Sequence, residues 1–443
     1  MGVYWEIEEL SLGTQGLTRT SGEIFAELAD DYSTAPEEVD WTAWRKRWGA
    51  GVGRVIDNPE RLMSTWPAEP FKGSGFDYKW LLSTDSLFRL VDAGGISAQS
   101  LRVTQAGNPL PENQLTVDDR LGKPAFGSNL DRVRIAQAVR DRGTLALQGL
   151  ENHEPHVRRF ITDVAVDLGC IVNCTAFYSG GNATGFPPHY DTHHVLLLQV
   201  EGRKVWNVAP SSVEHPHIGH AWPDRHARNP RLELVRSSSS WSTFALRPGE
   251  HLWIPRGWVH HGVADEGGSL HVTIGMMPLD YAWLFQQMGE DLLEAAEFRT
   301  YLSPGWTAGY TVEAQLAEFR QRVQSAVDKI NVRSAIVRLK EFVWFAASRQ
   351  PARSFFPQWQ GDVSIDDLDE VYVNQSVVIG WRIVGQVVEL HCGDRIGRFP
   401  AKLDRLVETL QSDDGGLKTK VLREVAGADF GRCMEFLLRL GVI

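Results

Sequence analysis

The sequence predicts an α+β protein in which a β-barrel or β-sandwich is surrounded by helices. Its 443 residues are 43% hydrophobic and 23% charged, a globular composition that excludes a disordered or fibrous chain and suggests about three domains. Short β-rich runs fill residues 171–275, separated by Gly, Pro and Asn, which is typical of a sandwich or barrel. Residues before and after this region show helical spacing of apolar side chains.

Charge and cysteine content narrow the classes of partner. The net charge of −11 offers no broad surface for phosphate backbones or anionic lipid, so we expect no general nucleic-acid binding and no membrane contact. Only Cys170 and Cys174 of the four cysteines are close, without a second pair to complete a zinc site, so the thiols are expected to be reduced. The N-terminus resembles no signal peptide and no apolar run reaches membrane-spanning length, which predicts a soluble, cytoplasmic protein.

The helical lead-in and the barrel strands are expected in this order along the chain. Segments 22–32 and 130–143 space their apolar residues at three and four, which predicts amphipathic helices. The barrel strands are expected within residues 174–181, 193–202, 203–210, 242–250, 251–257 and 269–276. Glu201–Gly202 lies between two of these runs and is interpreted as a tight hairpin turn, because glycine supplies a positive φ.

After Pro278 the pattern becomes helical. One apolar stripe with steps of three and four consists of Val312, Leu316, Phe319, Val323, Val327 and Ile330, and a second continues it over residues 336–347. Such a stripe packs either on its own barrel or on a second subunit, and both readings stay open at this point. A proline-rich, aromatic connector at 348–362 indicates a domain boundary, followed by a small α+β unit with strands within 371–392 and helices within 400–443.

Ten of the 14 histidines lie between His189 and His261, inside the predicted barrel. His189 and Asp191 are two residues apart, so on a strand they project from the same face, and a buried carboxylate beside an imidazole favours a bound cation. The segment RPGEHLWIPRGWVHHG supplies a third ligand from His260 or His261. Two histidines and one carboxylate are typical of non-haem Fe(II) oxygenases, although zinc can occupy such a set and a histidine-rich barrel can lack metal.

Three further residues are candidates for binding a 2-oxo acid at the open metal positions. Lys204 follows the expected turn and can return its ammonium to the cavity, although such a lysine is often a surface residue. Ser269 and Thr273 lie on the strand after the third ligand, where their hydroxyls either hydrogen-bond the acid or face outward.

Two runs together resemble a known family. TAFYSGGNATGFPPHYDTHHVLLLQVEGRKVWNV contains G-F-x-P-H-x-D followed by Q-x-E-G-R-K-x-W, and LRPGEHLWIPRGWVHHGVADEGGSLHVTIGM contains P-G-x-x-L-x-I-P-R-G-x-x-H and S-L-H-x-T. In order and spacing they resemble JmjC-domain oxygenases, specifically the ribosomal-protein hydroxylases that act on histidyl or arginyl residues. The resemblance implies a double-stranded β-helix, the cupin or JmjC jelly roll, within the α+β class.

The resemblance also implies a site and a domain arrangement. It implies Fe(II) bound by His189, Asp191 and His260, with 2-oxoglutarate held by Lys204 and dioxygen as the oxidant. In outline it extends to an oxygenase domain at 1–278, a helical dimerisation domain at 279–355 and a winged-helix-like domain at 356–443. The implied protein is a homodimer, whose winged-helix-like domain is too weakly basic for DNA binding and is structural or contacts protein.

The sequence departs from the family on the strand before H-x-D. Thr175 and Phe177 stand where nucleolar members have asparagine and tyrosine, and Gly180–Gly181 replaces a double proline. Thr175 remains a candidate co-substrate contact. The expected activity is hydroxylation of a side chain in a protein or peptide, most consistent with a ribosomal protein. The alternatives are tailoring of a biosynthetic peptide or small metabolite, demethylation of N-methyl-lysine, and a non-oxidative metal-binding cupin acting as an isomerase or binding module.

The third metal ligand depends on strand parity. His260 and His261 are adjacent, so on an extended segment they point to opposite sides. The resemblance aligns His260 with the ligand of P-R-G-x-x-H and leaves His261 at the mouth of the pocket. Parity counted backwards from His271 does not decide between them, because the GVADEGG segment can insert a bulge.

Overall fold

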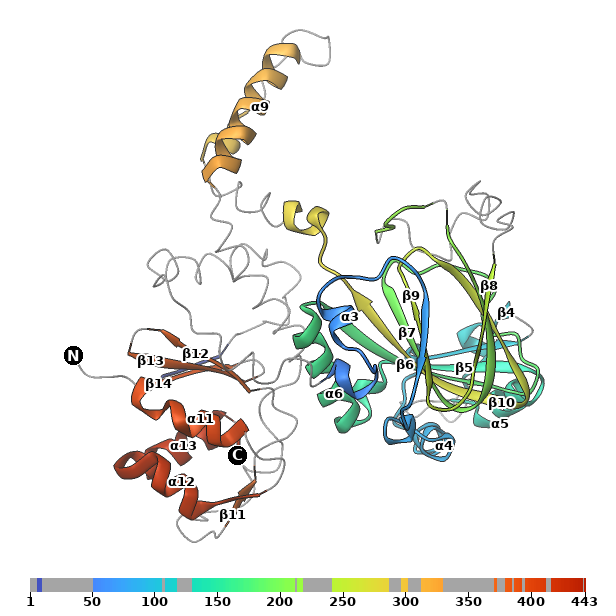
Figure 1. The fold of residues 1–443 in the computed structure, drawn as a ribbon, viewed down its shortest axis with the longest axis horizontal. Helices are drawn as coiled ribbons and strands as arrows, with labels where there is room; N and C mark the ends of the chain where they lie inside the picture. Colours follow the sequence, from blue (N-terminus) through green and yellow to red (C-terminus); the bar gives the residue numbers. More distant parts are fainter. Residues whose placement is uncertain are drawn as a thin grey trace. The chain divides into compact units, whose positions relative to one another are not determined.

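The protein is described by a computed structural model (Figure 1). It describes residues 6–9, 51–105, 108–117, 130–211, 213–217, 241–286, 296–301, 312–329, 370–372, 379–384, 386–392, 395–411, 416–440 and 442–443. The chain divides into two compact units. One spans Trp44–Pro278, and the other combines Leu279–Ile443 with Met1–Ala43.

The first unit is an antiparallel sheet covered by helices. Its strands are β2 (Phe71–Ser74), β3 (Leu101–Gln105), β4 (Asn108–Pro109), β5 (Gly143–Gln148), β6 (Ile171–Ser179), β7 (His194–Ala209), β8 (Ser242–Leu246), β9 (Glu250–Ile254) and β10 (Val259–Met277). Its α-helices are α3 (Glu60–Met63), α4 (Thr84–Asp92), α5 (Arg132–Arg140) and α6 (Pro155–Leu168). The strand order is β2-β9-β7-β10-β6-β5-β3-β4, with β8 paired to β7. The predicted cupin-like fold with surrounding helices is therefore confirmed, and its sheet is antiparallel.

Alternating side chains give this sheet an outer and an inner face. Along β6, Cys174 and Ala176 are fully buried in the core between the sheet and the helices. The intervening residues Thr175 and Phe177 line an interior cavity. A second, smaller apolar cluster fills the barrel interior from β7, β8 and β9. The period of two thus separates the structural core from the cavity-facing residues.

The two longest strands, β7 and β10, pair along almost their whole lengths. This pairing contradicts the hairpin predicted at Glu201–Gly202, because β7 continues through both residues without reversing. Opposite them, the β10 register shifts between Ala264 and Ser269, where extra residues form a bulge. Gly202 has a φ of 66°, and a Cβ there would lie 2.1 Å from the Gly268 carbonyl oxygen. The glycine therefore serves the close approach of two bulged strands rather than a turn.

The second unit contains a four-stranded sheet and, in the last 40 residues of the chain, three described α-helices. The sheet order is β1-β14-β13-β12, formed by β1 (Glu6–Glu9), β12 (Ile379–Val384), β13 (Val387–Cys392) and β14 (Arg395–Pro400). The helices are α11 (Asp404–Gln411), α12 (Thr419–Ala426) and α13 (Phe430–Leu440), and β11 (Glu370–Tyr372) pairs with β15 (Gly416–Lys418). Because β1 pairs antiparallel with β14, the assignment of residues 1–278 to one domain is wrong for this N-terminal strand.

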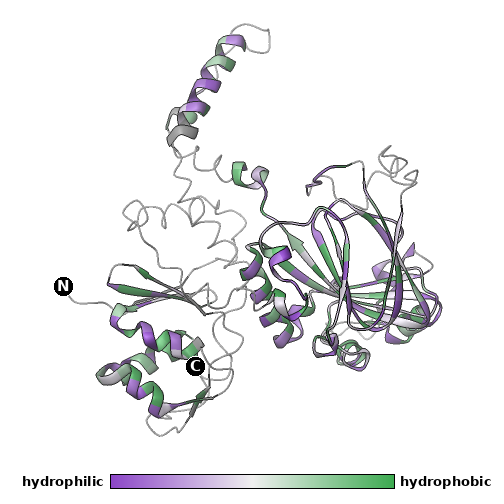
Figure 2. Cartoon of the chain, in the orientation of Figure 1, coloured by the Kyte–Doolittle hydropathy of each residue, from purple (hydrophilic) through white to green (hydrophobic). Residues whose placement is uncertain are grey.

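The stripe predicted after Pro278 falls on α9 (Val312–Lys329), which carries both hydrophobic and hydrophilic residues along its length (Figure 2). Leu316 is 43% and Phe319 is 56% exposed, so these members of the stripe lack a covering surface within the described chain. The amphipathic segment at 22–32, the second stripe at 336–347 and the connector at 348–362 lie outside the described residues. Among the described helices, none combines the length and apolar character needed to span a membrane.

Candidate metal centre and co-substrate pocket

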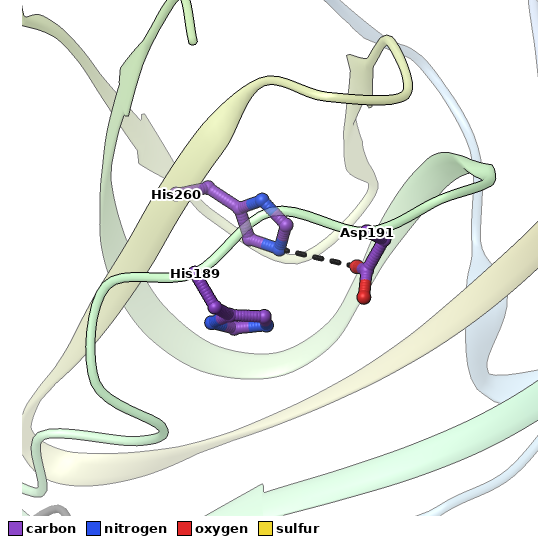
Figure 3. Close-up of side chains that lie close together, drawn as sticks. All are labelled: His189, Asp191 and His260. Carbon is purple, nitrogen blue, oxygen red and sulfur yellow. Dashed lines mark ion pairs between the residues drawn. The ribbon is translucent and has the colours of Figure 1, made fainter. Parts of the chain in front are cut away.

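The structure brings His189, Asp191 and His260 together at the end of the barrel. His189 and Asp191 lie in the segment between β6 and β7, and His260 is the second residue of β10. One ligand atom from each residue lies within 4.8 Å of the other two, and the side chains point toward one another (Figure 3). His260 Nε2 is 3.6 Å from Asp191 Oδ2. This spacing is suited to a single metal ion bound on one side by two imidazoles and a carboxylate.

Backbone pairing holds the two ligand-bearing segments in register. The His260 amide donates to the His189 carbonyl at 2.8 Å, and the His189 amide donates back to the His260 carbonyl at 3.2 Å. The Gly257 amide also donates to the Asp191 carbonyl at 2.9 Å. Segments far apart in the chain are therefore fixed as an antiparallel bridge, which positions the ligands before any ion binds.

Hydrogen bonds also orient the two imidazole rings. His189 Nδ1 lies 2.8 Å from the Pro187 carbonyl oxygen, and His260 Nδ1 lies 3.0 Å from that of Trp258. A carbonyl only accepts, so each Nδ1 carries the proton and donates it, which leaves each Nε2 lone pair available. Both rings are thus held in the tautomer that a metal requires at Nε2.

Burial and neighbouring charges shift the pKa values of His260 and Asp191. Burial lowers the pKa of His260 to about 4, so its imidazole is neutral at neutral pH. Burial opposes ionisation of Asp191, but the neighbouring imidazoles of His189, His193 and His260 outweigh it and lower the pKa of that carboxyl below its usual value. Neutral imidazoles and an ionised carboxylate are the forms that bind metal ions.

The triad lines a cavity of about 640 Å³, and a buried lysine, Lys204, lines the same cavity. Lys204 is 2% exposed, and its Nζ donates to Ser179 Oγ at 3.0 Å. Ser179 Oγ lies 2.9 Å from Thr144 Oγ1, so a pair of buried hydroxyls supports the ammonium. No carboxylate among the described residues forms an ion pair with Lys204, and burial lowers its pKa to about 7. A buried cation without an anionic partner is suited to binding an anionic ligand.

Glycines leave the space that Lys204 occupies. A Cβ at Gly262, two residues after His260, would lie 2.8 Å from Lys204 Cε. A Cβ at Gly185 would lie 3.5 Å from Lys204 Nζ. The small residues beside the metal triad therefore allow the ammonium into the same cavity.

The three hydroxyl residues proposed as co-substrate contacts differ in position. Thr175 and Thr273 form a cross-strand pair between β6 and β10 and both line the cavity. Thr273 Oγ1 is buried and has no hydrogen-bond partner among the described residues, so it can serve a ligand. Ser269 differs from its predicted role as a co-substrate contact. It does not line the cavity, and its Oγ accepts a hydrogen bond from Gln199 Nε2 at 2.8 Å. It lies beside the β10 bulge, directly opposite Ser179 on β6.

Sequence reasoning missed Ser179, Trp206 and His271. Trp206 and His271 line the cavity, and Ser179 accepts a hydrogen bond from the Lys204 ammonium. The period of two could have identified each of them, because Trp206 follows Lys204 by two residues and Ser179 follows Thr175 by four. His271 lies two residues before Thr273 on the same face.

The two adjacent histidines have different positions. His260 is 4% exposed and contributes to the metal triad. His261 is partly buried, lines the cavity and contacts Trp241 edge-on at a ring-centroid distance of 5.4 Å. Extended backbone at these residues thus directs one imidazole to the metal site and the other to a separate part of the cavity wall.

The fold and site together define a metal-binding double-stranded β-helix protein of the cupin type. Within it, residues 150–284 match the model of the JmjC domain family. The chain is similar to the bifunctional lysine-specific demethylase and histidyl-hydroxylase NO66 of Brugia malayi, with 31% identity over 110 residues, 25% of this chain and 15% of that protein. Ribosomal oxygenase 1 of Homo sapiens is 29% identical over 119 residues, 27% of this chain and 18% of that protein.

The matched region therefore covers less than a fifth of these relatives' lengths. The fold is also similar to the solved X-ray structure of YcfD from E. coli, with a TM-score of 0.51 and 17% identity. That likeness covers 87% of this chain and 96% of YcfD, and at this identity it concerns the fold alone.

Proposed function

We propose that this protein is an Fe(II)- and 2-oxoglutarate-dependent oxygenase that hydroxylates a side chain of a protein, with a ribosomal protein as the first candidate substrate. The observation that carries the proposal is the His189, Asp191 and His260 triad in one cavity with the ammonium of Lys204, which has no carboxylate partner among the described residues. The similarity to JmjC proteins named as a histidyl-hydroxylase and a ribosomal oxygenase supports it.

The residues of the cavity fit both ferrous iron and 2-oxoglutarate. Both imidazoles offer Nε2 and Asp191 offers an ionised oxygen, a donor set that suits ferrous iron and leaves positions for other ligands. Lys204 and Thr273 provide a buried cation and an unpartnered hydroxyl for the carboxylates of a 2-oxo acid. Iron bound here would supply oxidative decarboxylation of 2-oxoglutarate by dioxygen, in which one oxygen atom enters succinate as carbon dioxide leaves and the other is inserted into a C–H bond of the substrate.

The chain itself supplies binding, orientation and exclusion of water. Lys204 fixes one end of the dicarboxylate while the triad faces the other end, so the co-substrate is held in one direction. Phe177 and Trp206 make much of the wall apolar, which limits water around the reacting atoms.

Succinate formation tests the reaction class directly. We expect the protein with Fe(II), 2-oxoglutarate and ascorbate to release succinate, and His189→Ala or Asp191→Ala to lose this turnover while remaining folded. Undiminished succinate production by either variant would remove the metal assignment. Absence of succinate from a metal-loaded wild type, with or without ribosomal proteins, would favour the non-oxidative cupin.

Substrate identity needs a separate experiment. Mass spectrometry of ribosomal proteins and peptides from cells with and without the protein should reveal a +16 Da shift on one residue. The second candidate is an oxygenase that tailors a biosynthetic peptide or a small metabolite, which is favoured by Thr175 and Phe177 in the cavity wall. A modified metabolite without a modified ribosomal protein would select it. Loss of a methyl group from lysine would instead indicate demethylation, an activity named for the NO66 relative.

The proposal extends to the assembly. The exposed Leu316 and Phe319 on α9 support a homodimer formed through this helix. The three helices and small strands of the second unit support a winged-helix-like domain that contacts protein rather than DNA. The net charge of −11 also weighs against general nucleic-acid binding. A cytoplasmic location is supported by four cysteines that are all free, buried thiols.

A further inference from the structure

His271 lies inside the cavity and has no role in the metal triad. It is 1% exposed on β10 and lines the cavity with Lys204 and Trp206. Its Nδ1 is buried without a partner, and the ring forms no hydrogen bond to any described residue. Buried polar groups are almost always hydrogen-bonded, so an exception that faces a cavity requires an explanation.

Two aromatic rings fix the orientation of this imidazole. His271 stacks on Phe177 with an interplanar angle of 4° and a centroid distance of 5.0 Å. Trp206 contacts it edge-on, with centroids 5.2 Å apart and an angle of 86°. The two contacts restrict rotation of the ring, and no described residue accepts a hydrogen bond from it.

The same neighbours place His271 beside Lys204. Lys204 Nζ lies 4.9 Å from the centroid of the Trp206 ring that His271 contacts. Their partners are two residues apart on one face of β6. Lys204 donates a hydrogen bond to Ser179, and His271 stacks on Phe177. Burial and then the Lys204 charge lower the pKa of His271 well below its usual value, so the imidazole is neutral with one N–H donor.

We propose that His271 binds the carboxylate that Lys204 neutralises, by donating its imidazole N–H to a carboxylate oxygen of the 2-oxo acid. The inference rests on the proposed 2-oxoglutarate dependence and adds a second, neutral donor to that site. Lys204 supplies charge, whereas His271, held between Phe177 and Trp206, supplies direction. Phe177 offers no hydroxyl for this purpose, so the donor comes from the strand paired with it.

The test measures co-substrate affinity rather than turnover. Calorimetry on the full chain loaded with redox-inert Zn(II) gives the Kd of 2-oxoglutarate for wild type and variants. His271→Phe keeps the stacked ring and removes the donor, and we expect its Kd to rise about 10-fold or more. His271→Asn retains an N–H and should recover a large part of the affinity. Zinc stoichiometry should be unchanged in both variants.

His251→Phe is the matched control. His251 is also fully buried and has an unpartnered Nε2, but its Nδ1 hydrogen-bonds Tyr78 Oη and it lies outside the cavity lining. Its Kd for 2-oxoglutarate should match that of the wild type. An equal loss of affinity in this control would assign the effect to a weakened barrel and overturn the inference.

The outcomes separate this inference from the proposed function. Wild type that binds no 2-oxoglutarate would refute the proposed function itself. Wild type that binds it, with His271→Phe binding within about twofold, would refute only the role of His271. If His271→Phe does not fold, imidazole ¹⁵N spectra of the wild type with Zn(II) decide the matter. Adding 2-oxoglutarate should then shift the imidazole signals that disappear in His271→Asn, and unshifted signals would overturn the inference.

Discussion

At the scale of single residues, the site depends on which side of a strand each group faces. His260 and His261 have the same side chain, yet His260 lies 3.6 Å from Asp191 while His261 contacts Trp241. Lys204 and Trp206 share one face of β7 and enter the cavity together. The role of each side chain depends on how deeply it is buried and on which groups it contacts, because these surroundings set its protonation state.

Replacing each of the two adjacent histidines by alanine tests which of them is the metal ligand. His260→Ala should lose bound iron and all 2-oxoglutarate turnover, because it removes one of three ligands. His261→Ala should keep the metal and alter at most the coupling to substrate. Metal content by atomic absorption, measured beside succinate release, checks both. Retention of iron in the first variant with loss in the second would reverse the assignment.

Removing Lys204 should weaken co-substrate binding steeply. Loss of one partner from a buried ion pair costs about 3 to 5 kcal/mol, so Lys204→Ala should raise the 2-oxoglutarate requirement by at least about 100-fold. Arg203→Ala is the neighbouring control, because Arg203 is exposed and paired with Asp265. A change under about threefold in Lys204→Ala would move the role to Arg203 or another cation.

The lowered pKa of Lys204 also predicts a pH dependence of binding. Burial lowers the pKa of this ammonium to about 7 in the free protein, so it is mostly protonated below neutral pH and progressively neutral above it. Only the protonated form attracts a carboxylate, so the Kd for 2-oxoglutarate should rise as pH increases from about 7 to 9, by up to about tenfold per pH unit. Titration of the Zn(II)-loaded protein by calorimetry measures it, and a flat profile would contradict the assignment.

At the scale of elements, β7 and β10 build the site by bending together. The β10 bulge between Ala264 and Ser269 lies opposite Gly202, so the paired strands change direction without separating. The C-terminal halves of β7 and β10 then contribute Lys204 and His271, respectively, to one cavity. The short backbone bridge between His189 and His260 closes the same cavity at the metal end.

Gly202 should be intolerant of a side chain. It has a φ of 66°, and a Cβ would meet the Gly268 carbonyl oxygen at 2.1 Å, so Gly202→Val combines backbone strain with a clash. We expect the free energy of unfolding to fall by about 1 to 3 kcal/mol or more, measured by chemical denaturation. Gly267→Ala is the control, because a Cβ there meets nothing within 4 Å. Equal stability of both variants would disprove the role given to Gly202.

At the scale of the whole molecule, the chain makes two units, and the second includes residues from both ends of the sequence. Glu6–Glu9 forms the edge strand β1 beside β14, so a segment distant in sequence completes that sheet. The second unit also contains α9, with Leu316 and Phe319 exposed. An exposed apolar stripe on a helix favours association with a second copy.

Charges placed in the stripe should separate the subunits. Phe319→Asp combined with Val323→Asp puts two carboxylates on the apolar face of α9, and sedimentation should then show monomers. Ala314→Asp combined with Ala317→Asp adds the same charge to the opposite face of the helix and should leave the dimer intact. A wild type that is already monomeric at micromolar concentration would rule out the interface.

The sequence alone predicted a barrel or sandwich, the strands around the metal site and the candidate residues His189, Asp191 and Lys204. The family resemblance, and not the strand pattern, selected His260 over His261. These predictions depend on local information, since side-chain parity and short motifs are written within a few consecutive residues. The helical character of the segments that form α5, α9 and the C-terminal helices followed from apolar spacing for the same reason.

Only the tertiary structure decided the contacts made between distant strands. It replaced the hairpin at Glu201–Gly202 with a continuous strand, took Ser269 out of the ligand space and moved the N-terminal strand into the second unit. It also placed His271 between Phe177 and Trp206. Each of these features depends on the register between strands, and a bulge changes that register. No local sequence pattern specifies it, because strands form their hydrogen bonds and side-chain contacts only when distant segments come together.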